Sequence, residues 1–241
     1  MISELFQRIP HKNWRTALFL FILILLVHIT AAFLKSLSLN FIGMSLYIIL
    51  PLICIKRDLW KEIRIKKPIN SHYILLGILL ITFLVVITST IYYLLWGFTT
   101  SNYMVIIAKQ QMGYGVINKA NEWKYFPIAA LGFCLISPFT EEFFYRGLLL
   151  KALESRFNLG IANIIHAFLF GIVHMFYFGL VEFNWGLLLF IPIGLPGSYL
   201  FGWTVQKTES VYSSVILHIV HNFLVILFVY VFIIPSIGTF S

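Results

Sequence analysis

The sequence predicts an all-α fold: a polytopic bundle of about seven transmembrane helices with a polar site inside it. Hydrophobic residues make up 60% of the chain and charged residues only 11%, whereas a soluble domain usually carries about 25% charged residues. The apolar residues also fall in long runs, and a run of about 20 crosses the hydrocarbon core as a helix. Helices are expected because lipid offers backbone groups no partners.

The apolar runs divide the chain into its elements in order. We expect spans at 16–34, 37–55, 73–97, 125–150, 159–178, 185–206 and 211–235. The longest polar connection, 99–124, is expected to be an exposed loop or a helix lying on the surface. We therefore divide one integral membrane unit into N-terminal helices with a surface loop, 1–123, and a helical core, 124–235.

The net charge of +8 indicates topology rather than nucleic-acid binding, because no basic helix interleaved with aromatic residues is present. Lys and Arg accumulate in cytoplasmic segments beside membrane spans. With the N-terminus in the cytoplasm and the C-terminus outside, the inner segments hold twelve Lys or Arg and the outer ones four. These inner segments are 1–15, 56–72, 151–158 and 207–210. We expect an integral protein of a prokaryotic cell membrane, with the lipid bilayer as its surroundings.

Ionisable residues inside the spans are candidates for function, because a charge in the bilayer is costly. They are Glu141, Glu142 and Arg146 in the fourth span, His166 and His174 in the fifth, and His218 and His221, beside Asn222, in the seventh. Glu142 and Arg146 are four residues apart and can pair on one helix face, a pair that we interpret as structural rather than catalytic. Glu141 lies about 100° round the helix and is free to face another element.

The spacing of the fourth and fifth spans predicts which residues share a depth. Glu141 lies 16 residues before position 157, in the intervening turn, and His174 lies 17 after it. In an antiparallel hairpin the two therefore lie level, about 25 Å from the turn. We expect a site at mid-membrane, formed with His218 and Asn222 and reached from the cytoplasmic side. Pro138 is expected to kink the fourth span and free backbone groups near this site.

Three sequence motifs lie in separate apolar spans. Glu141-Glu142-Phe-Phe-Tyr-Arg146 looks like E-E-x-x-x-R, Phe170-Gly-Ile-Val-His174 like F-x-x-x-H, and His218-Ile-Val-His-Asn222 like H-x-x-x-N. In this order and spacing they resemble the type II CAAX prenyl endopeptidase (CPBP) family of intramembrane proteases. The likeness covers roughly 124–235, and the first three spans add nothing diagnostic.

The resemblance implies a catalytic site and a role for each residue. The residues matching Glu141 and His174 activate a water, and those matching His218 and Asn222 stabilise the oxyanion. Glu142, Arg146 and Phe170 would support them. A positioned carboxylate suits general base catalysis, and pre-placed donors suit a developing oxyanion. The substrate would be a membrane-associated protein or peptide, and a prokaryotic member need not cleave prenylated ones.

A metal requirement stays open in the sequence. Family members are also called metalloproteases, and Glu141, His174 and His218 could hold a divalent metal such as Zn²⁺ with an open position for water. The chain lacks H-E-x-x-H, and these ligands come from three helices, which favours a metal-free Glu/His mechanism.

Two other functions fit part of the pattern. A non-proteolytic membrane scaffold, immunity factor or regulator could keep the fold without the activity. A small transporter could use Glu and His as a proton relay, although no inverted repeat is visible. We interpret His166 as a helix-packing residue and His28 as non-catalytic. His221 is next to Asn222 in the sequence but does not lie on the helix face that His218 and Asn222 share.

Overall fold

The helices of this computed structural model follow the predicted spans closely. The structure describes residues 14–34, 37–54, 63–113, 122–179 and 185–237, and every regular element in these ranges is helical. The single helices are α2 (Trp14–Phe33), α3 (Leu37–Cys54), α4 (His72–Trp96), α5 (Tyr103–Gly113), α9 (Leu159–Gly179) and α10 (Trp185–Thr208). The fourth span is one composite rod of α6 (Glu122–Ala130), η2 (Leu131–Ile136), α7 (Ser137–Glu142), η3 (Phe143–Leu149) and α8 (Leu150–Glu154). The last comprises α11 (Val211–Phe228), η4 (Val229–Ile233) and α12 (Ile234–Ile237).

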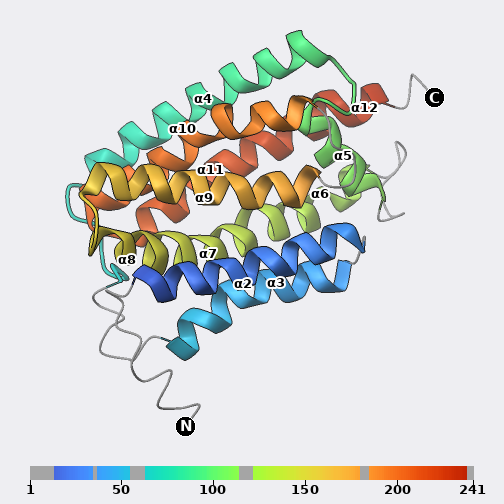
Figure 1. Ribbon diagram of the computed structural model, residues 1–241. Coiled ribbons are helices and arrows are strands. Elements are labelled where there is room, and N and C mark those ends of the chain that lie inside the picture. The colour runs from blue at the N-terminus through green and yellow to red at the C-terminus, as the bar shows by residue number, and fades with distance from the viewer. Residues whose placement is uncertain (1–13, 35–36, 55–62, 114–121, 180–184, 238–241) are drawn as a thin grey trace.

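The helices form one bundle around the acidic fourth span. The α2–α3 hairpin packs against α7 and η3 on one flank, and α4 packs against α10 and α11 on the other (Figure 1). Between these flanks, α9 and α10 form a closely packed pair. In this arrangement α7, α9 and α11 turn the faces that carry the three motifs towards the interior, where Glu141, Phe170 and His218 are buried.

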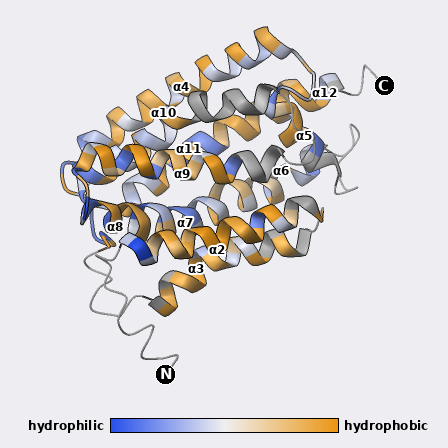
Figure 2. Ribbon diagram, in the orientation of Figure 1, coloured by the Kyte–Doolittle hydropathy of each residue, from blue (hydrophilic) through white to orange (hydrophobic). Residues whose placement is uncertain are grey.

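The outer surface of the bundle suits lipid. Large apolar side chains point outwards, including Phe19, Leu79, Phe83, Leu94 and Ile164, each more than half exposed. Hydrophobic residues predominate along the helices (Figure 2), and large exposed apolar patches mark contact with a membrane or a partner. Within the described ranges, four helices are long and apolar enough to cross a bilayer, namely Trp14–Ala31, His72–Trp96, Trp123–Glu154 and Val211–Ser236. These helices indicate an integral membrane protein, and the count of seven crossings stays a prediction.

The segments predicted to be cytoplasmic meet at one end of the bundle. Arg64 forms two bonds to the Glu154 carboxylate, at 2.9 and 3.1 Å. The amide of Ile69 donates to the Thr208 carbonyl at 2.9 Å. Residues 63–71 thus form a strap across this end. The basic residues Arg8 and Lys12 and the loop part 56–62 lie outside the described residues.

A second contact of the strap bears on its charge. Lys66 Nζ donates to Glu209 Oε2 at 2.6 Å, and this hydrogen bond holds the pKa of Glu209 below its usual range. Both side chains are exposed, so the pair adds little stability.

The connection 99–124 differs from the expected exposed loop or surface helix. Part of it forms α5, whose Met104, Val105 and Ala108 are fully buried against η4. The Met104 amide donates to Asn102 Oδ1 at 3.0 Å, which caps the start of this helix. The polar residues of 99–124 are the reason for the expected exposure, yet Asn102 is buried. The side chains of Gln110, Gln111, Asn118 and Asn121 lie outside the described residues.

The orientation can be tested with single cysteines on exposed positions. After Cys54 and Cys134 are replaced, Lys67→Cys lies on the strap and Thr99→Cys near the opposite end of the bundle. We expect a membrane-impermeant maleimide applied to intact cells to label Thr99→Cys and not Lys67→Cys, because basic segments stay inside. The reverse labelling would invert the topology.

Candidate active site

The helix that carries the acidic pair departs from α-helical geometry on both sides of it. Residues 131–136 and 143–149 are π-helical, and such turns occur frequently at functional sites. At the first, the Ser137 amide bonds the Gly132 carbonyl five residues back. Continuing this pattern would bond residue 138 to Phe133, but Pro138 has no N–H. The Asn222 side chain supplies the missing donor instead, with Nδ2 at 2.7 Å from the Phe133 oxygen.

Glu141 and His174 face each other across the site. Glu141 Oε2 lies 3.5 Å from His174 Nε2, while its other oxygen accepts a hydrogen bond from Ser137 Oγ. His174 Nδ1 lies 2.9 Å from the Phe170 carbonyl oxygen. Because a carbonyl only accepts, this nitrogen carries the hydrogen and Nε2 is turned towards Glu141. The Phe170 ring also lies 4.1 Å from the His174 ring.

Glu142 links the predicted ion pair to the third motif. Its Oε1 accepts from Arg146 Nη1 at 2.7 Å, as the helical spacing predicts, and also from His218 Nδ1 at 2.7 Å. Arg146 is fully buried, donates to Ser198 Oγ at 3.0 Å and lies over the Phe170 ring at 4.4 Å. The carboxylate therefore fixes His218 with its Nε2 away from Glu142. Sequence spacing gave no sign of this bond because it joins two helices.

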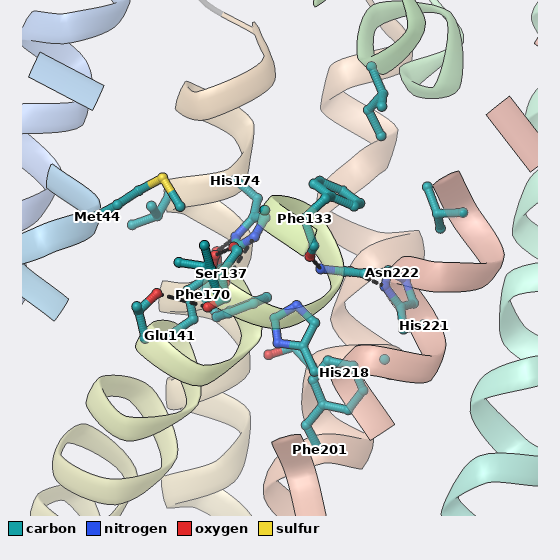
Figure 3. A pocket seen from close by; sticks show the side chains of 18 of the residues that line it. Met44, Phe133, Ser137, Glu141, Phe170, His174, Phe201, His218, His221 and Asn222 are labelled. Atoms are coloured by element: carbon teal, nitrogen blue, oxygen red, sulfur yellow. Dashed lines mark hydrogen bonds and ion pairs between the residues drawn. The ribbon is translucent and has the colours of Figure 1, made fainter. Parts of the chain in front are cut away.

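All four residues that the resemblance makes catalytic lie on one cavity. It measures about 650 Å³ and is lined by Glu141, His174, His218 and Asn222. Figure 3 shows Glu141, Ser137 and His174 gathered on one side of it, and Asn222 with His221 on the other. The remaining wall is mainly apolar. It comes from α2, α3, α4, α5 and α10 as well as from the motif helices, and includes His28, Tyr47, Ile81, Tyr92, Ile107 and Phe201.

The histidines outside the motifs separate into two groups. His221 lines the cavity and bonds Asn222, and His28 lines it while stacked 5.7 Å from the Tyr47 ring. His166 is fully buried beside Tyr145 and is not on the cavity wall, which fits a helix-packing role. Ser137, four residues before Glu141, is a further site contact that helical spacing could have indicated.

The cavity extends away from the strap. Beyond the site its wall continues to Tyr92, Tyr103 and Tyr125, near α5. On the strap side, Tyr145, Leu149 and other buried side chains fill the bundle. Access to the site from the cytoplasmic side stays a prediction, because no contact among the described residues identifies which end of the bundle is cytoplasmic. Equal distance from a turn places two residues at one level, whereas side-chain packing decides which end of the bundle is filled.

The donor types would suit zinc, but their placement does not form a closed ligand set. Both motif histidines use Nδ1 for a carbonyl or carboxylate and leave Nε2 for the site, as in many metal centres. Among the described residues, however, no three His, Cys, Asp or Glu side chains converge closely enough to hold a metal ion. We therefore derive no step through a metal.

The fold and this site define a helical membrane protein with a polar, partly enclosed centre between its helices. Residues 123–224 match the family model described as "Type II CAAX prenyl endopeptidase Rce1-like", a stretch that contains all three motifs. The chain thus carries an Rce1-like domain, and this family implies CAAX-type intramembrane protease activity. No curated protein and no solved structure matches the chain.

The buried ion pair should matter more for folding than for chemistry. Arg146→Ala leaves the Glu142 carboxylate without its compensating charge, which costs about 3–5 kcal/mol. We expect a lower yield of monodisperse protein in detergent by size-exclusion chromatography, with Lys151→Ala on the same helix near wild type. Normal yield and thermal stability with lost activity would instead place Arg146 in the mechanism.

Proposed function

We propose that this chain is an intramembrane endopeptidase that hydrolyses a peptide bond of a membrane-associated protein or peptide. The observation that supports this most is the convergence of four motif side chains from three helices on one cavity inside an apolar bundle. Two of them, Glu141 and His174, face each other on the cavity wall, with Oε2 and Nε2 3.5 Å apart.

The first step is the activation of water by this pair. A water beside the two groups donates one hydrogen to Glu141 Oε2 and the other to His174 Nε2, which accepts when the ring carries its hydrogen on Nδ1. Glu141 takes the proton as the water oxygen attacks the scissile carbonyl carbon, which makes it the general base. Ser137 fixes the carboxylate through the opposite oxygen.

The second step places negative charge on the former carbonyl oxygen. Asn222 Nδ2 has two hydrogens, and the one not bound to the Phe133 carbonyl serves as a donor. His218 donates from Nε2 when both ring nitrogens carry hydrogen, and the Glu142 carboxylate at 2.7 Å compensates the resulting positive charge. Donors held in advance in a dry site stabilise such an oxyanion strongly.

The third step breaks the peptide bond. The tetrahedral intermediate collapses, the C–N bond cleaves, and Glu141 returns its proton to the leaving nitrogen. The products are a carboxylic acid and an amine, and the base is restored. A mainly apolar wall favours an extended hydrophobic peptide segment as substrate.

The experiment is a cleavage assay with purified protein in nanodiscs. Lipidated and unlipidated peptides are incubated with wild type and Glu141→Gln, product termini are read by mass spectrometry, and the bound metal is measured in both samples. Cleavage by wild type alone supports the proposal. Wild type that cleaves none of the peptides, although Glu141→Gln still complements a deletion in cells, would favour a scaffold, immunity or regulatory protein of this fold.

A further inference from the structure

The Asn222 amide is held at both of its ends. Its Nδ2 donates to the Phe133 carbonyl at 2.7 Å, and its Oδ1 lies 2.9 Å from His221 Nδ1. The carbonyl can only accept, so the nitrogen of the amide must face Phe133 and the oxygen must face His221. An amide oxygen only accepts as well, so His221 carries its hydrogen on Nδ1.

The hydrogen bond from Asn222 to the Phe133 carbonyl exists because of a proline. Pro138 cannot donate to Phe133, and the π-helical turn leaves that carbonyl for a side chain from α11. The second hydrogen bond to the amide comes from His221, the residue next to Asn222 in the chain. Neither the motif spacing nor the proposed mechanism uses His221.

His221 is itself fixed in the site. Its ring lies edge-on to Phe201 at 6.0 Å, and Phe201 stacks on the His218 ring at 5.1 Å. His221 is therefore packed against the same aromatic side chain that supports the other oxyanion donor.

We infer that His221 is a positioning residue that fixes the Asn222 amide so that its second Nδ2 hydrogen faces the scissile carbonyl. Turning the amide over would place Nδ2 against the His221 N–H and Oδ1 against the Phe133 carbonyl, two repulsive contacts in a site with little water. Without His221 one of these contacts disappears and the wrong orientation becomes accessible. This inference rests on the proposed function of Asn222.

The activity test uses two substitutions at one position. His221→Phe keeps a ring of similar size and removes the donor, and we expect kcat to fall about 10-fold, the loss of one buried hydrogen bond, with KM near wild type. His221→Gln keeps an N–H donor and should recover part of the loss. In an Asn222→Ala background, His221→Phe should cause no further loss, because it acts through Asn222. His72→Phe, away from the cavity, serves as the control.

Two results of this test overturn the inference. One is an equal loss from His221→Phe with and without Asn222, which would mean an independent role. The other is wild-type kcat in His221→Phe while hydrolysis still depends on Glu141. In that case the inference fails although the proposed function holds.

A second measurement needs no substrate. In protein with ¹⁵N-labelled histidine, the His221 signal is assigned by its loss in His221→Phe, and its nitrogen shifts report which nitrogen carries hydrogen. We expect hydrogen on Nδ1 in wild type and its redistribution in Asn222→Ala. The same shifts in both proteins would overturn the contact, whether or not the chain hydrolyses peptides. If Glu141-dependent hydrolysis is absent while the redistribution occurs, the proposed function fails and the contact stands.

Discussion

Glu141→Gln is expected to keep the fold and lose hydrolysis. Gln has nearly the volume of Glu, and its carbonyl oxygen can still accept the Ser137 hydroxyl, so packing survives. It cannot take a proton from water near neutral pH, and the nucleophile-forming step should slow by about 10²–10⁴-fold. The measurement is kcat on a cleaved peptide, with thermal stability in detergent recorded for the same samples.

The control for this substitution is Glu209→Gln, an exposed carboxylate at the strap end of the bundle. It removes the same charge outside the cavity and should leave kcat unchanged. Full complementation of a deletion by Glu141→Gln in cells would end the protease interpretation, because a biological effect independent of proton transfer belongs to a scaffold or regulator.

The helices and two polar pairs were predictable because they depend on local patterns. Long apolar runs fixed the spans to within a few residues. The spacing of Glu142 and Arg146 predicted their contact, found at 2.7 Å. Equal distance from one turn predicted that Glu141 and His174 lie level, and their atoms lie 3.5 Å apart.

The remaining contacts depend on how helices pack, which no local pattern contains. The bond between His218 and Glu142 joins residues 76 positions apart, and that between Asn222 and Phe133 joins residues 89 apart. The burial of α5 likewise results from packing against η4, whereas the polar residues near α5 in the sequence suggested exposure. The direction of the cavity follows from which end large side chains such as Tyr145 fill.

The Glu142 carboxylate explains why the ion pair and the site cannot be separated. One oxygen accepts from both Arg146 and His218 at 2.7 Å. Arg146 compensates the carboxylate, and the carboxylate orients the histidine, so a pair interpreted as structural also positions a side chain that we propose to be catalytic. This arrangement resembles the carboxylate–histidine pairing of hydrolases, in which a buried acid fixes the orientation of a ring.

The N-terminal helices complete the cavity although the family match begins at residue 123. His28 and Tyr47 come from α2 and α3, and Ile81 and Tyr92 from α4. Chemistry would then be carried by the matched region, and much of the wall that meets a substrate by helices outside it. Substrate choice is therefore expected to follow α2–α4 rather than the motifs.

Asn222→Ala should lower kcat by about 10²–10³-fold with KM nearly preserved, because an oxyanion donor acts in the transition state and not in the ground state. Glu141 and His174, the pair that activates water, stay intact, so the fall in kcat should be smaller than that caused by Glu141→Gln. Removing the amide also leaves the Phe133 carbonyl without its donor beside Pro138, so thermal stability should fall slightly.

A second variant separates the two effects of this residue. Asn222→Asp keeps the size of the side chain but offers the Phe133 carbonyl an acceptor in place of Nδ2, and it should be less active than wild type and less stable than Asn222→Ala. Ser214→Ala, on the same helix and with its hydroxyl bonded to the Val211 carbonyl, is the matched control and should keep kcat. Single-turnover cleavage rates and melting curves of the three variants separate the effect of Asn222 on catalysis from its effect on stability. A rise in KM at unchanged kcat would make Asn222 a substrate-binding residue and remove it from the oxyanion site.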